Sequence, residues 1–339
     1  MNIAVDVAGG DHAPYEIIDG ALAALRYFPT VTLTLIGKNE VISEYLKNKT
    51  HDKSRLFIVN ATETITSHEA PAVAVKAKRD STLVVGAELI KDKKCDALIS
   101  AGSTGAILAS SLLHIGRIKG VLRPALCPII PTSTGCAMII DGGANMDCKP
   151  AFLVQFALMG SIFMDRVIGK SDPRVCLLNV GAEEKMGNEL TKEVYQDLKG
   201  LPGINFIGNL EGRDITNGDA DVVVCDGFSG NVLLKTIEGM GVFMGHSFGQ
   251  IFSGLPGKIA GGLVIKKINA LKKRMSYEEH GGSPLLGIDG VVIKMHGTSR
   301  AGTVMNSVKQ AMNVVENGVV ANIKEQLKIA LNSNDTPSS

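Results

Sequence analysis

Short apolar runs alternate with longer amphipathic stretches along the whole of this chain. The runs are rich in Val and Ile, as at Val222, Val223 and Val224, and several end directly in a glycine turn. Continuous β-branched runs are typical of parallel strands that are covered on both faces. Because strand-like and helix-like segments alternate from end to end, we predict an α/β fold in which a mainly parallel sheet is sandwiched by helices.

The apolar periodicity gives the expected order of elements. Strands are expected at residues 3–7, 31–37, 56–59, 96–100, 126–130, 136–141, 174–180, 204–208, 222–225 and 288–295. Helices are expected at residues 14–28, 39–49, 68–94 in two pieces, 104–115, 150–169, 188–199, 303–317 and 319–331. We find no interdomain linker, so we predict a single α/β unit over residues 1–331 and a flexible tail over residues 332–339.

One segment, residues 229–276, departs from this alternation because its pattern is helical throughout. It is long enough for two helices that turn near residues 253–257, and we predict a projecting helical hairpin. In the second helix Val264 and Ile268 belong to an apolar stripe, lysines lie off the stripe, and residues 250–276 contain no acidic residue. A basic amphipathic helix of this kind is typical of anionic membrane surfaces, although packing on the core or on a dimer partner explains the same pattern.

Composition narrows the class of protein. The chain has 38 glycines among 339 residues, well above the roughly 7% of average proteins, which suits many tight strand-to-helix turns. The net charge of +1 gives no reason to expect a nucleic-acid partner. The 6 cysteines are scattered without C-x-x-C spacing, and the first residues lack the features of a signal peptide. We therefore expect a cytoplasmic protein with reduced cysteines and no transmembrane span.

Glycine-rich turns follow four of the predicted strands, at residues 8–12, 101–105, 141–145 and 226–231. In open α/β sheets, the carboxyl ends of the strands form the ligand site. Backbone N–H groups in such turns bind phosphate or a developing oxyanion. The first strand is not followed by a G-x-G-x-x-G segment, and we find neither a P-loop nor clustered metal ligands, so we expect no cofactor and no metal. The turns favour phosphate chemistry or acyl transfer.

Seven segments, in order along the chain, carry a resemblance to a known family. They are residues 9–14, 101–106, 147–150, 187–190, 211–214, 226–231 and 290–297. Together they resemble the phosphate acyltransferase family (PlsX) of bacterial phospholipid synthesis. The sequence departs from the usual family residues at Ala8, Ser103, His280 and Arg300, and these departures leave the reaction class unchanged.

The resemblance implies an α/β/α fold of the isocitrate dehydrogenase or phosphotransacetylase type. It implies transfer of a long-chain fatty acyl group from acyl carrier protein to inorganic phosphate, with hand-off of the acyl phosphate to a glycerol-3-phosphate acyltransferase. It also implies a homodimer that associates peripherally with the membrane. The residues expected to meet the membrane or the acyl chain are Phe252, Leu255, Val264 and Ile268.

The expected reaction needs positioning and charge control more than it needs a protein nucleophile. Phosphate is already an anionic nucleophile, and the thioester is already activated. A lysine offsets the phosphate charge, and an amide stabilises the tetrahedral oxyanion. Lys185, in the turn after the 174–180 strand, and Asn231, at a helix start, are the catalytic candidates. Without the resemblance, Lys185 is an ordinary loop lysine and Asn231 an ordinary helix cap.

Further candidates surround these two. The residues expected to bind phosphate are Gly9, Gly10, Asp11, His12, Ser103, Thr104, Gly105, Ser229 and Gly230. The residues expected to support them are Asn145, Asp147, Lys149, Asn188, Glu211, Asp226 and His296. We expect Asn145, Asp147 and Lys149 to orient one another by ion pairing. Asp226 and Glu211 are expected to hold Lys185 or Arg213.

Three other functions fit parts of the pattern. The first is a phosphate acyltransferase that takes short acyl groups from coenzyme A, and the second is an NAD-dependent dehydrogenase of the isocitrate type. The third is a membrane adaptor without catalysis that uses only the basic helix. Acyl carrier protein is acidic, and either of two basic surfaces could receive it: Arg117, Lys119 and Arg123, or the lysines and arginine of residues 266–274.

Overall fold

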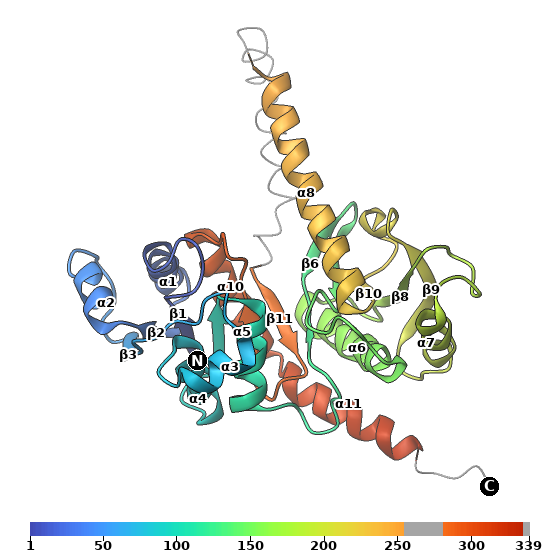
Figure 1. Ribbon diagram of the computed structural model, residues 1–339, viewed down its shortest axis with the longest axis horizontal. Coiled ribbons are helices and arrows are strands. Elements are labelled where there is room, and N and C mark those ends of the chain that lie inside the picture. Colours follow the sequence, from blue (N-terminus) through green and yellow to red (C-terminus); the bar gives the residue numbers. More distant parts are fainter. Residues whose placement is uncertain (254–280, 335–339) are drawn as a thin grey trace.

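The computed structural model describes residues 1–253 and 281–334, and it has two lobes, each built around its own sheet (Figure 1). The predicted α/β class is confirmed, since both sheets are mostly parallel and carry helices on their faces. The strands divide into two sheets instead of forming one. This division matters for function because it places two sets of strand ends beside each other.

The first sheet has the order β3-β2-β1-β4-β12-β11-β5. Its strands are β1 (Asn2–Asp6), β2 (Thr32–Gly37), β3 (Leu56–Asn60), β4 (Ala97–Ser100), β5 (Ala125–Leu126), β11 (Ser283–Leu286) and β12 (Val291–Lys294). Only β11 is antiparallel to its neighbours, β12 and β5. The sequence pattern predicts a single last strand at 288–295 and misses β11, a short strand that contains Pro284.

The second sheet has the order β6-β7-β10-β8-β9. Its strands are β6 (Ile129–Thr132), β7 (Gly135–Ile140), β8 (Arg174–Asn179), β9 (Asn205–Glu211) and β10 (Val222–Val224). β6 is antiparallel to β7, and the other pairs are parallel. The valine run of β10 is fully buried between β7 and β8, as its continuous apolar pattern predicts.

Side-chain alternation decides which helices cover which face of the first sheet. Ile3 and Val5 point to the face covered by α1 (Tyr15–Tyr27) and α10 (Ala301–Glu316). Ala4, between them, points to the opposite face, where it packs with Ile90 of α4 (Thr82–Lys91). The remaining helices of this lobe are α2 (Asn39–Leu46), α3 (Pro71–Ala77) and α5 (Thr104–Ser110), which continues as a π-helical turn over Ser111–Ile115.

The second sheet is covered in the same way. Met138 and Ile140 pack on the face of α6 (Pro150–Phe163) and α7 (Glu189–Lys199). Ile139 and Val223 face the other side, against the first turns of α8 (Gly227–Ile251). A 3-10 turn at Ile215–Asn217 precedes β10. The last helix, α11 (Val319–Asn334), packs on α6, so it links the two lobes.

Beyond its first turns, α8 leaves the body of the protein as a long projecting helix (Figure 1). It is the first helix of the predicted hairpin. The second helix, with Leu255, Val264 and Ile268, lies outside the described residues. Of the predicted tail, residues 332–334 belong to α11, and the rest lies outside the described residues.

One helix of the described chain is long and apolar enough to cross a membrane by length and composition, namely Pro150–Ile168, which joins α6 to a π-helical turn. Phe156 and Phe163 of this helix are fully buried in the core between the second sheet and α11. Its apolar character is therefore explained by packing inside the protein.

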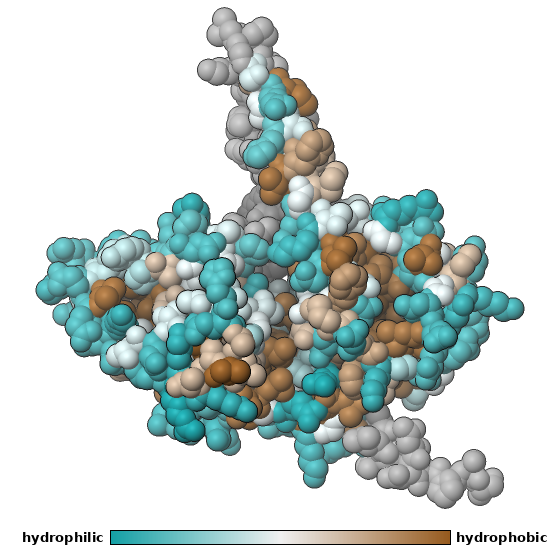
Figure 2. Space-filling model, viewed as in Figure 1, coloured by the Kyte–Doolittle hydropathy of each residue, from teal (hydrophilic) through white to brown (hydrophobic). Residues whose placement is uncertain are grey.

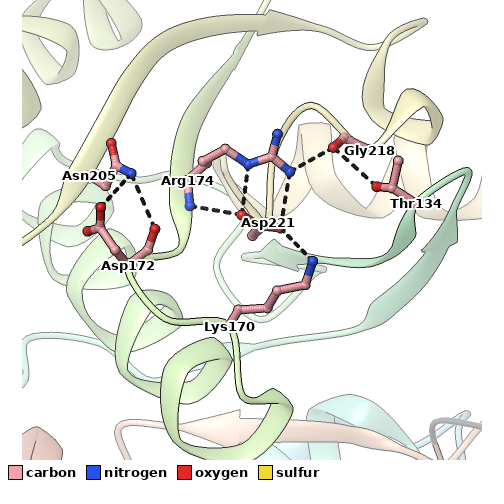
Figure 3. A network of polar contacts seen from close by, with 7 residues as sticks. All are labelled: Thr134, Lys170, Asp172, Arg174, Asn205, Gly218 and Asp221. Carbon is pink, nitrogen blue, oxygen red and sulfur yellow. Dashed lines mark hydrogen bonds and ion pairs between the residues drawn. The ribbon is translucent and has the colours of Figure 1, made fainter.

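The amino ends of β8 and β10 are joined by an ionic network (Figure 3). Asp221 accepts hydrogen bonds from the backbone N of Arg174 at 3.0 Å and from its Nε at 3.0 Å, and Lys170 Nζ lies 3.4 Å away. Burial alone would raise the pKa of Asp221, but the hydrogen bonds from Arg174 outweigh it and hold the pKa below its usual value. The network ties two neighbouring strands at their start.

Candidate functional site

In the first sheet, the turns after β1, β4 and β12 meet at the carboxyl edge. The N–H of Asp11 donates to the carbonyl of Gly297 at 2.8 Å. A Cβ on Gly9 would lie 2.7 Å from the backbone N of Gly102, so these two turns touch only because Gly9 has no side chain. Two of the four predicted glycine turns, those after β1 and β4, therefore meet in this lobe, while the other two follow strands of the second sheet.

Buried aspartates organise both carboxyl edges. Asp6, at the end of β1, accepts a hydrogen bond of 2.6 Å from Ser100 Oγ and one of 3.0 Å from Ala8 N. Asp141 follows β7 and accepts from the backbone N–H of Gly143 at 3.0 Å and of Asn145 at 2.7 Å. Burial raises the pKa of both carboxyls. Each aspartate thus fixes the turn that follows its own strand.

Asp141 also joins the two lobes. It accepts a hydrogen bond of 3.0 Å from the backbone N of Leu126, which belongs to β5 of the first sheet. The N–H of Gly142 donates back to the Leu126 carbonyl at 2.7 Å. The carboxyl edge of the second sheet is consequently held against the first sheet at this point.

The start of α8 fits tightly into the turn after β7. Asp226 caps the helix by accepting hydrogen bonds from Ser229 N at 2.8 Å and from Ser229 Oγ at 2.9 Å. A Cβ on Gly230 would lie 2.0 Å from the carbonyl oxygen of Asp141, so only glycine fits there. This close approach brings Asn231 to the turn, where its Nδ2 donates to the Gly142 carbonyl at 3.2 Å.

A hollow of about 100 Å³ opens between the two sets of strand ends. One wall is a single face of α8, because Asn231, Leu234, Lys235 and Glu238 follow the i, i+3, i+4, i+7 spacing. The residues of the other walls are Thr104, Leu126, Pro128, Ile129, Gly142, Gly281, Gly282, Ser283, Lys294 and His296. Elements of both sheets therefore build one shared site.

The hollow carries more positive than negative charge. Lys235 Nζ lies 2.6 Å from Glu238 Oε2 and 3.3 Å from His296 Nε2. His296 Nδ1 lies 2.8 Å from Thr298 Oγ1. Burial lowers the pKa of Lys294 to about 8, and burial followed by the nearby lysines lowers the pKa of His296. With a neutral imidazole, two lysines face one glutamate, which favours an anionic ligand.

This arrangement suits a reaction between an anion and a carbonyl compound. The ammonium groups attract the anion, and the Asn231 amide is a donor for an oxygen that gains negative charge. Among the described residues, no three His, Cys, Asp or Glu side chains are grouped so as to hold a metal ion.

Comparison with known proteins identifies the family. The family described as "Fatty acid synthesis protein" matches residues 1–322. The phosphate acyltransferase of Thermoanaerobacter pseudethanolicus is 45% identical over 97% of this chain and 98% of its own length. That of Dictyoglomus thermophilum is 47% identical over 96% of this chain and 98% of its own. The chain belongs to the phosphate acyltransferase (PlsX) family.

The fold of this phosphate acyltransferase is also found in distant solved structures. A phosphotransacetylase from Streptococcus pyogenes has a TM-score of 0.61 at 17% identity, covering 93% of this chain and 94% of its own. A branched-chain phosphotransacylase from Enterococcus faecalis has a TM-score of 0.59 at 15% identity, covering 93% and 99%. These likenesses confirm the expected α/β architecture. Because the chain belongs to an acyltransferase family, we no longer consider the dehydrogenase and adaptor functions.

The structure brings some of the predicted site residues of the phosphate acyltransferase together. Thr104, Asn231 and His296 line the hollow. Ten other predicted residues belong to the turns and helix starts at the same carboxyl edges. They are Gly9, Gly10, Asp11, His12, Ser103, Gly105, Asn145, Asp226, Ser229 and Gly230. Asn231 is not the cap of α8, because that role belongs to Asp226.

Other predicted residues lie elsewhere. Lys185 is exposed in the turn after β8 and does not line the hollow. Asn188 caps α7 by accepting from Thr191 N at 2.9 Å. Glu211 pairs with Arg213 at 3.1 Å, as predicted. The prediction that Asp226 holds Lys185 or Arg213 is wrong, because its carboxylate is used to cap α8.

The expected mutual pairing of Asn145, Asp147 and Lys149 is also wrong. Asn145 Nδ2 instead donates to Asp141 at 2.8 Å and to the Pro124 carbonyl at 2.8 Å. Within the described part of the chain, no ion pair joins Asp147 to Lys149, which stands at the start of α6. The buried charge of Asp141 attracts the amide more strongly than the exposed neighbours do.

Sequence reasoning missed the lysines and the glutamate that line the hollow: Lys235, Glu238 and Lys294. Two signals point to them. Lys235 and Glu238 lie four and seven residues after Asn231, so they share its face of the helix. Lys294 is a single charged residue directly after the apolar run from Val291 to Ile293. Burying a lysine there is costly unless an anionic group lies beside it.

Proposed function

We propose that this enzyme transfers a long-chain fatty acyl group from acyl carrier protein to inorganic phosphate. The family establishes a phosphate acyltransferase, for which phosphate is a substrate. The observation that carries the proposal is the cationic hollow between the two carboxyl edges, with the Asn231 amide in its wall. A phosphate oxygen attacks the thioester carbonyl carbon, the C–S bond breaks, and the thiolate leaves to be protonated by solvent.

Asn231 stabilises the oxyanion of the tetrahedral intermediate in this proposal. One amide hydrogen is used by the Gly142 carbonyl, which orients the group, and the other is available to the hollow. One such donor lowers the barrier by about 3 to 4 kcal/mol. We include Lys185 because of the family resemblance. It lies in the turn after β8, the strand beside β10, and in this proposal its positive charge offsets the charge of phosphate.

Long-chain specificity is supported by the surface of α8. Several of its large apolar side chains are exposed, namely Met240, Val242, Phe243, Met244 and Ile251 (Figure 2). Phe252, at its end, is partly buried. Short acyl groups need no such surface, whereas a fatty chain, a bilayer or a second copy of the chain would cover it. We include a homodimer and peripheral membrane association in the proposal for this reason. We also propose a cytoplasmic location.

Acyl carrier protein is the proposed donor because a basic surface is present for it. Arg117, Lys119 and Arg123 are exposed near the junction of the two lobes, where an acidic partner would dock. The alternative basic surface lies outside the described residues. Delivery of the acyl phosphate to a glycerol-3-phosphate acyltransferase completes the proposal.

A direct assay of donors tests this function. Purified protein is incubated with phosphate and either long-chain acyl carrier protein or acetyl coenzyme A, and acyl phosphate is trapped with hydroxylamine. We expect the trapped product with the long-chain carrier and at least tenfold less with acetyl coenzyme A. A preference for acetyl coenzyme A would overturn the proposed donor and leave the family assignment intact.

A further inference from the structure

Several backbone N–H groups of the glycine turns already have partners. Asp11 N donates to Gly297 O, and Gly102 N donates to Ser100 Oγ at 3.0 Å. In the second sheet, the N–H groups of Gly143, Ala144 and Asn145 all donate to Asp141. Donors that stabilise the fold in this way are not open to a ligand. These donors cannot hold an anion, so side chains must supply part of its contacts at this edge.

Lys294 is the side chain best placed to do so. Strand alternation directs Val291 and Ile293 toward the core beneath α1 and α10, so Lys294 points to the same face as Val292, which packs with Ala106 of α5. At the end of β12 this face opens into the hollow. Within residues 1–253 and 281–334, the partly buried ammonium of Lys294 makes no hydrogen bond or ion pair.

A second cation approaches from the other lobe. Lys235 lies on α8, one helical turn beyond Asn231, and its charge is one of the causes that lower the pKa of Lys294. Glu238 pairs with Lys235 at 2.6 Å, and it is the one carboxylate among the residues that line the hollow. Because Lys235 already pairs with Glu238, it is the partly buried charge of Lys294 that has no counter-ion among the described residues, which is costly unless an anion binds beside it.

We propose that Lys294, Lys235 and His296 form the seat of inorganic phosphate in this enzyme, with Lys294 as its principal ligand. The inference deepens the proposed function, on which it rests for phosphate being the attacking group. A phosphate offers several acceptor oxygens to ammonium donors on both sides. Asn231 lines the same hollow, so the nucleophile and the oxyanion donor share one space.

The first test measures phosphate binding without any acyl donor. Lys294→Met removes the charge but keeps a side chain of similar length, and Lys294→Arg keeps the charge. Lys309→Met, on the exposed face of α10, is the matched control. Titration calorimetry with inorganic phosphate is expected to show at least tenfold weaker binding for Lys294→Met, partial retention for Lys294→Arg and no change for Lys309→Met. Equal affinity of Lys294→Met and wild type overturns the proposal.

The second test separates free phosphate from the phosphate ester that an acyl donor carries. In steady-state assays, Lys294→Met is expected to raise KM for phosphate at least tenfold and to leave KM for the acyl donor unchanged. A rise confined to KM for the acyl donor overturns the proposal, since the lysines would then hold the donor. If Lys294→Met fails to fold by circular dichroism, Lys235→Met, whose side chain is half exposed, is measured in its place, with a threefold loss of phosphate affinity expected.

The two proposals can fail separately. Phosphate binding that depends on Lys294, together with no product from long-chain acyl carrier protein, would retain the phosphate seat and reject the donor. Product formation with phosphate affinity independent of Lys294 and Lys235 would retain the donor and reject the seat.

Discussion

The two ends of the second sheet differ in whether their charged side chains have partners of opposite charge. At the amino end, Asp221 is 5% exposed and has Arg174 and Lys170 as partners, so its charge is matched within the protein (Figure 3). At the carboxyl end, where the two sheets meet, Lys235 of α8 and Lys294 of β12 in the first sheet face a single glutamate, and Lys294 has no partner among the described residues. The matched charges at the amino end stabilise the fold, whereas the surplus positive charge at the carboxyl end suits an anionic ligand.

Removing the anion of the amino end should give the largest effect on stability. Asp221→Ala leaves Arg174 and Lys170 without their carboxylate, and breaking a buried pair of this kind costs about 3 kcal/mol. We expect that loss in the free energy of unfolding by urea at neutral pH, with turnover per folded molecule unchanged.

The pH dependence of this effect has a definite sign. Because the folded pKa of Asp221 is lowered, its contribution to stability is present above the unfolded value of about 3.9 and is lost as pH falls through the folded pKa. The difference between Asp221→Ala and wild type should therefore shrink in acid. A difference that grows in acid would show that Asp221 does not act through its charge.

Removing the oxyanion donor should separate activity from stability at the carboxyl end. Asn231→Ala is expected to lower kcat by about 100-fold, the usual effect of losing one such donor. Thermal unfolding should change little, because within the described residues the Asn231 amide makes one hydrogen bond, to the Gly142 carbonyl. Wild-type turnover in this variant would remove Asn231 from the mechanism.

Lys185 tests how far the site extends beyond the hollow. We expect Lys185→Ala to cut acyl phosphate formation at least tenfold with the fold retained, with Lys192→Ala on α7 as the control. Since Lys185 is exposed and lies outside the lining of the hollow, unchanged activity would confine the chemistry to residues that line it.

Lys294 adds a pH effect of smaller size. Its pKa of about 8 means that it loses its proton just above neutral pH, and phosphate needs the protonated form. Phosphate affinity should fall about eightfold between about pH 7.5 and about pH 9, and this fall should disappear in Lys294→Arg. Lys235, Glu238 and His296 face the same space, so calorimetry of Lys235→Met over the same range shows whether Lys235 contributes.

The local structure could be predicted from the sequence to a large extent. Val222, Val223 and Val224 form the buried strand that their β-branched run predicts, and the turn after them leads to the start of α8. These features depend on neighbouring residues, so a single sequence contains them. The division into two sheets does not, because pairs such as Leu285 with Leu126 join segments far apart in the chain.

Part of the lining of the hollow was expected from the sequence. Asn231 is predicted as the oxyanion donor, Thr104 as a phosphate ligand and His296 as a supporting residue, and all three line the hollow. Lys235 and Lys294 were missed because their meeting depends on how the two lobes approach each other. The sequence also could not show that Asp141 accepts hydrogen bonds from the N–H groups of the turn after β7. A glycine-rich pattern shows where backbone donors lie, but it does not show which acceptors they bond to.

The most direct test of the account measures turnover per folded molecule and melting temperature for Asp221→Ala and Asn231→Ala side by side, with trapped acyl phosphate as the readout. We expect Asp221→Ala to melt at a lower temperature and to keep its turnover, whereas Asn231→Ala should keep its melting temperature and lose about 100-fold in turnover. The reverse pattern, with activity lost at the amino end and retained at the carboxyl end, would contradict it.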